Sequence, residues 1–140
     1  MKATAPPSTP WIASVGRALP PHPTSQEAVT AALRAFWLRS HHNPARLEQF
    51  HEAVGVAGRH LALPIEAYLD LTDFTKSNQA WIAEAPKVGE AALARALDLA
   101  GLEPSSLDHL FFVTVTGLAT PTLDAMLVNR MGLRLSLIHI

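Results

Sequence analysis

The sequence of 140 residues contains no cysteine. This absence excludes disulfide bonds, thiolate metal sites and a cysteine nucleophile from these residues. An excess of one charge is missing as well, because 11 basic side chains stand against 12 acidic ones and the formal net charge is −1. Since a basic patch is the usual mark of a nucleic-acid-binding protein, the composition favours neither nucleic acid nor an anionic membrane surface as a partner.

Long apolar runs and secretory signals are also missing. No apolar run approaches the roughly 18 residues that suggest a membrane span. The opening stretch MKATAPPSTP has one lysine and no apolar core, so it does not have the pattern of a secretory signal. We therefore expect a cytoplasmic protein in which residues 1–10 form a disordered lead.

The motifs that bind nucleotide phosphates or present a serine nucleophile are absent. The sequence has no GxxxxGKS/T, GxGxxG or GxSxG stretch. The seven histidines do not form the i, i+4 pair of a helical zinc site, because His41 and His42 are adjacent and His51 and His60 follow at intervals of nine residues. We therefore expect no metal site and interpret the histidines as surface or loop residues.

Helical periodicity, with hydrophobic residues three or four positions apart, runs through four segments. They are Ser25–Arg39, Ala45–Val54, Asn78–Leu102 and Thr122–Met131. Thr24 and Glu27 have the spacing of a capping box for the first helix, and Leu47 and Phe50 should face inward in the second. Pro86 should kink or restart the third helix, because proline removes a backbone hydrogen bond from a helix interior.

Two apolar segments have the character of β-strands. Trp11–Leu19 alternates, and Leu110–Gly117 is a nearly continuous β-branched and aromatic run, typical of a parallel strand covered on both faces. A short strand or irregular arm is predicted around Pro64, and Gly101 and Gly132 should end helices. This order of elements indicates an α/β fold with helices layered on a mixed sheet. Because two clear strands make a poor sheet, we expect the missing strands downstream.

The turn after the second strand is the best candidate for a functional site. Gly117 permits a sharp turn directly after a buried strand. The hydroxyls of Thr116 and Thr120 would then lie at the carboxyl edge of the sheet, where open α/β sheets bind ligands. A plainer alternative stays open, and spacing alone favours it: Thr120 and Pro121 could simply begin the next helix, with the hydroxyl as its cap.

Four stretches, in consistent order from Trp11 to Arg134, resemble type III polyketide synthases, the chalcone synthase-like family, and are most similar to its bacterial members. They are IASVGRALPPHPTSQEAV, VAGRHLALPIEAY, PKVGEAALARALDLAGLEPSSLDHLFFV and TVTGLATPTLDAMLVNRMGLR. In that family the last stretch is the turn and helix that precede the active-site cysteine. The closing residues 135–140, LSLIHI, do not resemble the family.

The resemblance implies a thiolase-like fold of two similar halves, of which residues 11–134 would be most of the first. Members of the family are homodimers that load an acyl-CoA starter onto a cysteine and extend it with malonyl-CoA, without a cofactor beyond these substrates. A histidine and an asparagine of the second half polarise the thioester carbonyl and stabilise the developing enolate. We therefore expect a truncated chain with residues 135–140 as a foreign tail, no catalytic residue present, and no activity of the chain alone.

The resemblance also implies four substrate-binding residues, Thr116, Thr120, Arg46 and Arg59. Both threonines match positions that line the acyl cavity, and Thr120 matches the residue that reaches into the partner's cavity across the dimer. Arg46 matches a basic residue that contacts the CoA phosphates, and Arg59 matches a further basic position. Gln49 and Ala53 replace two other basic residues of the family, so a solvated surface charge is an equal interpretation of the arginines.

Two other functions stay open beside the type III synthase. One is a related thiolase-fold condensing enzyme of the ketoacyl synthase III type, and the other is a non-catalytic partner that dimerises with a full-length copy. A truncated half would also expose the face meant to pack on the missing half. Because large exposed apolar patches promote association, we expect poor solubility.

Overall fold

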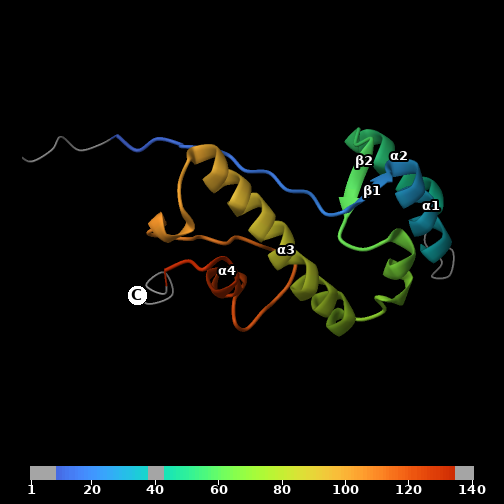
Figure 1. The fold of residues 1–140 in the computed structure, drawn as a ribbon. Coiled ribbons are helices and arrows are strands. Elements are labelled where there is room, and N and C mark those ends of the chain that lie inside the picture. Colours follow the sequence, from blue (N-terminus) through green and yellow to red (C-terminus); the bar gives the residue numbers. More distant parts are fainter. Residues whose placement is uncertain (1–8, 38–42, 135–140) are drawn as a thin grey trace, which may run out of the picture.

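The computed structural model describes residues 9–37 and 43–134. Its elements in chain order are β1 (His22–Ser25), α1 (Gln26–Trp37), α2 (Pro44–Val54), β2 (Gly58–Leu61), η1 (Ile65–Asp70), α3 (Phe74–Ala100), η2 (Pro104–Ser106) and α4 (Leu123–Met131). The long helix α3 runs through the centre of the molecule. Helix α4 lies beside one end of it, and α1, α2 and the two strands lie beyond the other end (Figure 1). The described part of the chain is thus mostly helical.

The sheet in the described residues is smaller than the sequence predicts. It consists of β1 and β2 alone, paired antiparallel with His22 opposite Leu61 and Ser25 opposite Gly58. The prediction of helices layered on a mixed sheet is therefore wrong for this part of the chain. A short strand or irregular arm was predicted around Pro64, and the structure has the strand β2 before this proline and a 3₁₀-helix after it.

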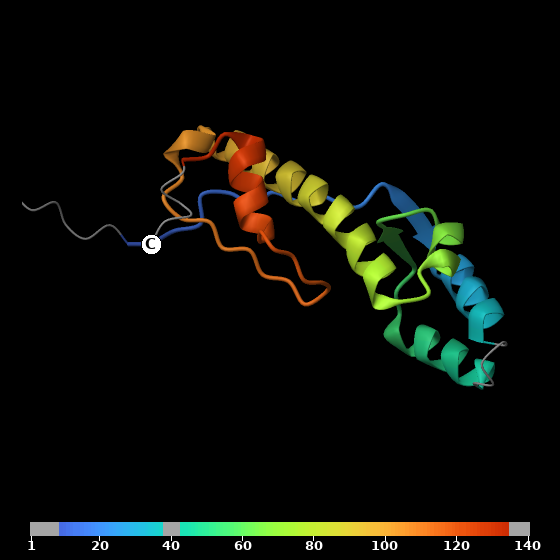
Figure 2. The same cartoon turned by 90° about the horizontal axis from the view of Figure 1, so that it is seen from below.

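The two predicted strands, Trp11–Leu19 and Leu110–Gly117, belong to no ladder among the described residues. Both are extended segments that run along α3 (Figures 1 and 2). The first is fastened by the Ser14 hydroxyl, which donates to the Ala96 carbonyl at 2.6 Å. The apolar character of Leu110–Gly117 predicts burial on both faces, but this prediction is wrong here, since Phe111, Val113 and Val115 are exposed. A ladder also needs neighbouring strands, and the described residues offer none to these segments.

The start of α1 corrects the predicted cap. The Ser25 hydroxyl accepts a hydrogen bond from the Ala28 amide at 3.2 Å, so Ser25 is the cap. The Thr24 hydroxyl instead donates to the carbonyl of His22 at 3.2 Å, so the prediction of Thr24 as the cap is wrong. The predicted end of this helix at residue 39 lies outside the described residues.

Local chemistry explains the bounds of α2. The Asn43 side chain accepts from the Ala45 amide at 3.1 Å, Pro44 opens the helix, and Gly55 ends it in the left-handed region at φ 64°. Leu47 is buried as predicted, at 4% exposure, but Phe50 is 58% exposed and the prediction that it faces inward is wrong. Its ring lies on the outer face below the Arg46 guanidinium, 5.8 Å from ring centre to Cζ.

Helix α3 is longer than predicted and is not interrupted. Its cap is Asp73, whose carboxylate accepts from the Lys76 amide at 2.9 Å. Pro86 is buried within the helix, which continues from Phe74 to Ala100 without restarting. Gly101 ends α3 at φ 65°, as the sequence predicts.

The hydrophobic core lies mainly between α3 and α4. Its buried side chains are Leu97, Leu123, Leu127, Val128 and Leu133. Leu127 packs against α3 at Gly89, where a Cβ would lie 3.4 Å from a methyl group of Leu127, an ordinary van der Waals contact. An ion pair between Glu90 and Arg130 joins the same helices at the surface. Among the described helices, none is both long and apolar enough to cross a membrane.

Candidate functional site

The turn that follows Leu110–Gly117 is held against the first turns of α3. The Asn78 side chain accepts from the Leu118 amide at 2.8 Å and donates to the Leu118 carbonyl at 2.8 Å. Gly117 lies against Trp81, since a Cβ at this glycine would stand 2.6 Å from Cδ2 of the indole. A glycine is therefore required here for close approach to Trp81, and a tertiary contact determines where the turn lies.

The turn brings Thr116 to the rim of an apolar cavity of about 560 Å³. Aliphatic and aromatic side chains from α1, from the segment between β2 and the end of η1, and from α3 form its walls. Among its few polar groups are the hydroxyls of Thr116, Ser77 and Tyr68. The Ser77 hydroxyl donates to the Asp73 carbonyl and the Tyr68 oxygen accepts from the Ala62 amide. The site is thus a mostly apolar space with a polar rim, the usual composition of a small-molecule pocket.

Thr120 is exposed and does not line this cavity. It is not the cap of α4 either, because the cap residue is Thr122, whose side chain makes no capping hydrogen bond. The plainer alternative, in which Thr120 caps the last helix, is therefore wrong. Gly132 ends α4 at φ 63°, as predicted.

The two candidate arginines lie apart from the apolar cavity. The Arg46 guanidinium stacks over Phe50 on α2. The Nε of Arg59, on β2, donates to Oε1 of Gln26 at 3.0 Å, and the Gln26 side chain is buried. Neither arginine lines the cavity at Thr116, so the structure does not gather the four predicted residues into one cluster.

Comparison with known proteins shows what this arrangement resembles. No family model matches the sequence. The 1,3,6,8-tetrahydroxynaphthalene synthase of Streptomyces peucetius is 43% identical over 123 residues, which cover 88% of this chain and 33% of the relative. The crystal structure of 1,3,6,8-tetrahydroxynaphthalene synthase from Streptomyces coelicolor, a bacterial type III polyketide synthase, superimposes with a TM-score of 0.73 at 31% identity, covering 89% of this chain and 36% of that one.

The chain is homologous to part of the type III polyketide synthases. It spans about one third of the length of the relatives it matches. The fold is accordingly a partial thiolase-like fold. A more distant structure, CsyB complexed with CoA-SH, is 23% identical with a TM-score of 0.70 and agrees in fold. The recognition of this family from four sequence stretches is confirmed.

Sequence reasoning missed two residues that place the turn, Asn78 and Trp81. Asn78 stood within a predicted helix, where an amide side chain is ordinarily solvated. No local signal links it to Leu118, because the two residues lie 40 positions apart. The only available hint was Gly117, whose missing side chain indicates that something approaches closely.

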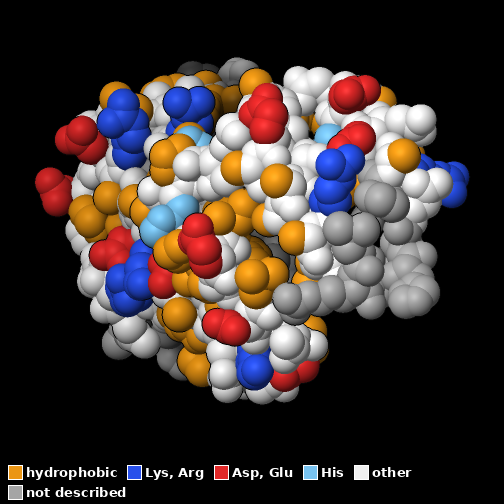
Figure 3. Space-filling model, turned by 90° about the vertical axis from the view of Figure 1, so that its right-hand side faces the viewer, with side chains coloured by type: hydrophobic (Ala, Val, Ile, Leu, Met, Phe, Trp, Pro, Cys, Tyr) orange, Lys and Arg blue, Asp and Glu red, His pale blue; other side chains and the backbone are white. Residues whose placement is uncertain are grey.

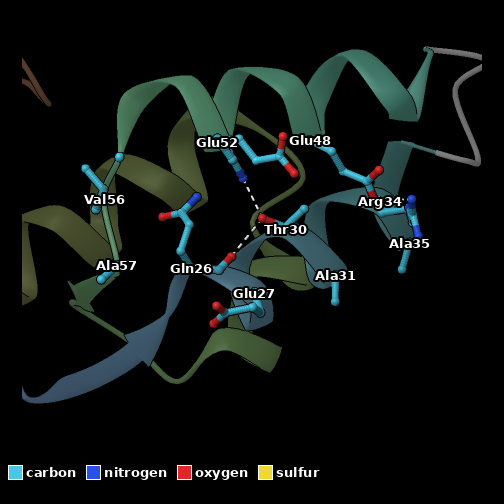
Figure 4. A pocket seen from close by; sticks show the side chains of 12 residues that line it. Gln26, Glu27, Thr30, Ala31, Arg34, Ala35, Glu48, Glu52, Val56 and Ala57 are labelled. Carbon is cyan, nitrogen blue, oxygen red and sulfur yellow. Dashed lines mark hydrogen bonds and ion pairs between the residues drawn. The ribbon is translucent and has the colours of Figure 1, made fainter.

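A second cavity, of about 680 Å³, lies between α1 and α2 (Figure 4). The Thr30 hydroxyl donates to the Gln26 carbonyl at 2.7 Å and lies 2.6 Å from Nδ1 of His51. Since that hydroxyl has one proton, the His51 nitrogen is the donor in this pair. An ion pair of Arg34 with Glu48 links the same helices, so these polar groups serve to join α1 to α2.

Titration offers little evidence for chemistry in the described residues. The pKa of the Glu27 carboxyl is lowered from its ordinary 4.5, first by a hydrogen bond with its own backbone amide and second by the Ser25 side chain. This carboxylate is stabilised at the start of α1, as expected at a helix N-terminus. The described part of the chain has no group of three or more potential ligand side chains placed to hold a metal ion.

Proposed function

We propose that this chain is the N-terminal part of a type III polyketide synthase that condenses an acyl-CoA starter with malonyl-CoA, and that the chain alone is inactive. The observation that carries the proposal is the 43% identity to a 1,3,6,8-tetrahydroxynaphthalene synthase in a chain without any cysteine. Thioester condensation in this family requires a thiol as the covalent carrier. The chain therefore contributes binding surface, while the nucleophile, histidine and asparagine come from sequence beyond it.

In this proposal Thr116 and Thr120 line the acyl cavity. The position of Thr116 at the rim of the apolar cavity supports a role of its hydroxyl in orienting an acyl group whose apolar part fills the space behind. Thr120 is exposed, which fits contact with a second subunit of a homodimer. The expected boundaries, a family domain at residues 11–134 and a foreign tail at 135–140, remain predictions, because the tail and residues 1–8 lie outside the described residues. The expected cytoplasmic location also remains a prediction.

Arg46 and Arg59 are proposed to contact the phosphates of CoA. Both side chains are exposed, and a guanidinium suits phosphate because it can donate two parallel hydrogen bonds. Neither arginine lines the cavity at Thr116, so the proposed ligand is long, with phosphates at one end and the reacting thioester at the other. The alternative of solvated surface charges predicts no effect of either arginine on CoA binding.

The central test is an assay of the purified chain with an acyl-CoA starter and malonyl-CoA. We expect neither condensation product nor release of free CoA by mass spectrometry, because no thiol can accept the acyl group. The synthase of Streptomyces coelicolor serves as the positive control. Product formed by the chain alone would overturn the proposal, and so would an uninterrupted gene that encodes no cysteine shortly after α4.

A binding measurement tests the arginines separately from the chemistry. Calorimetry with CoA should show weaker binding for Arg46→Ala and Arg59→Ala, each by about three- to tenfold, as for loss of one charge-assisted hydrogen bond. Arg95→Ala, at an exposed position of α3, is the matched control. Equal affinities of all three variants would favour the interpretation as solvated surface charges.

A further inference from the structure

The backbone of Leu118 is paired with a side chain. Both its amide and its carbonyl bond to the amide group of Asn78, each at 2.8 Å. A neighbouring strand ordinarily offers one donor and one acceptor to such an extended residue. The Asn78 side chain offers the same pair from the first turns of α3, so one residue takes the place of a strand neighbour.

The other contacts of the turn do not determine its position on α3 in the same way. The amide of Thr116 bonds to the hydroxyl of Thr114 at 3.2 Å, which is a contact within the segment. Gly117 touches the Trp81 ring, but an apolar contact is not directional. In the described residues, the two hydrogen bonds of Asn78 are therefore the directional link between the turn and the helix.

We propose that Asn78 is a positioning residue of the acyl site. By holding Leu118 it fixes the turn two residues after Thr116, and thereby keeps the Thr116 hydroxyl at the rim of the apolar cavity. This inference rests on the proposed function, because the site that Asn78 would position is the one assigned to the acyl group. The hydrogen-bond link itself can be tested without any acyl-CoA.

The chemistry of the amide determines which substitutions report on the link. An amide has both a donor and an acceptor, whereas an ionised carboxylate only accepts. Asn78→Asp therefore keeps the hydrogen bond from the Leu118 amide. It loses the bond to the Leu118 carbonyl and places a negatively charged oxygen next to that carbonyl oxygen. The protonated carboxyl regains a donor, so it reproduces both bonds. The pKa of the introduced carboxyl should consequently lie above the ordinary value of about 3.9 for aspartate.

The test is residue-resolved amide hydrogen exchange on the full chain, expressed as protection relative to the intrinsic exchange rate at each pH. Asn78→Ala should lower the protection of the Leu118 amide by about tenfold or more, the effect of losing hydrogen bonds of ordinary strength. Asn78→Asp should lower it near neutral pH and restore it as the pH falls through the carboxyl pKa. Gln79→Ala, an exposed neighbour on the same helix, should leave it unchanged.

Two comparisons keep the outcome interpretable. Protection of amides near Leu97, in the buried part of α3, should not change, which separates release of the turn from general unfolding. A nuclear Overhauser contact between the Trp81 ring and Gly117 should disappear in Asn78→Ala and persist in Gln79→Ala. Unchanged Leu118 protection in Asn78→Ala, or no recovery at low pH in Asn78→Asp, would overturn the inference. Failure of CoA binding with this link intact would count against the proposed function alone.

Discussion

Leu127 is the residue whose truncation should most weaken the described fold. It is 2% exposed and is the largest fully buried side chain. Its methyl groups lie 3.4 and 3.8 Å from where a Cβ of Gly89 would stand, so the side chain packs on the backbone of α3. Helical backbone cannot move in to fill the space left by Leu127→Ala. The cost should therefore be about 3–5 kcal/mol, in the range measured for buried leucines in other proteins.

The measurement is urea unfolding followed by far-ultraviolet circular dichroism, since most of the signal comes from helices. A loss of this size is a large part of the roughly 5–15 kcal/mol that stabilises a typical domain, and it should lower Tm by about 10 °C or more. Leu99→Ala is the matched control on α3, because Leu99 is 57% exposed and should cost less than about 1 kcal/mol. Similar losses for both variants would refute the packing of α4 on α3 described above.

Three further predictions concern the ends of helices and the surface. Folding lowers the pKa of Glu27, so its contribution to the free energy of unfolding is present above about pH 4.5 and is lost as the pH falls through the folded pKa. Glu27→Gln should therefore lower the urea midpoint above that pH and match the parent at lower pH. Equal midpoints at every pH would contradict this. Gly101→Ala should cost about 1 kcal/mol in the same unfolding assay, because φ is 65° there; no loss would contradict the left-handed cap. Val113→Lys should reduce association in analytical ultracentrifugation, since Val113 is 90% exposed, whereas Gln79→Lys, which adds the same charge at an exposed polar position, should not. A parent chain that is monomeric would be evidence against the expected poor solubility.

The exposed apolar surface explains why the last of these predictions concerns the segment Leu110–Gly117. Phe111, Val113 and Val115 are 87, 90 and 101% exposed, while Phe112 between them lies near Gly89 of α3. Burial therefore alternates only from Leu110 to Val113, and residues 114–116 are all exposed. Hydrophobic side chains are also exposed between charged ones at the end of the molecule that carries α1 and α2 (Figure 3). Such surfaces favour association in water.

The candidate site could be predicted only in part. The turn around Gly117 was predicted from the sequence, because a glycine and hydroxyls after an apolar strand are a local pattern, and the role of Thr116 in binding stays a prediction. The cavity beside Thr116 was not predicted, since its walls come from α1, from the region of η1 and from α3. Which side chains meet there depends on how distant segments pack, and no spacing in one segment encodes it.

The sequence by itself determined the chemistry that is impossible here and the ends of several helices. Absence of cysteine rules out a thiol nucleophile in these residues, and Pro44, Gly55, Gly101 and Gly132 mark helix ends because capping involves residues within one turn of each other. Tertiary structure alone decided that two strand-like segments run unpaired along α3 and that Asn78 holds Leu118. Strand ladders and hydrogen bonds such as those between Asn78 and Leu118 need partners that are remote in the chain. The sequence of one segment therefore does not reveal which residues will bond to it.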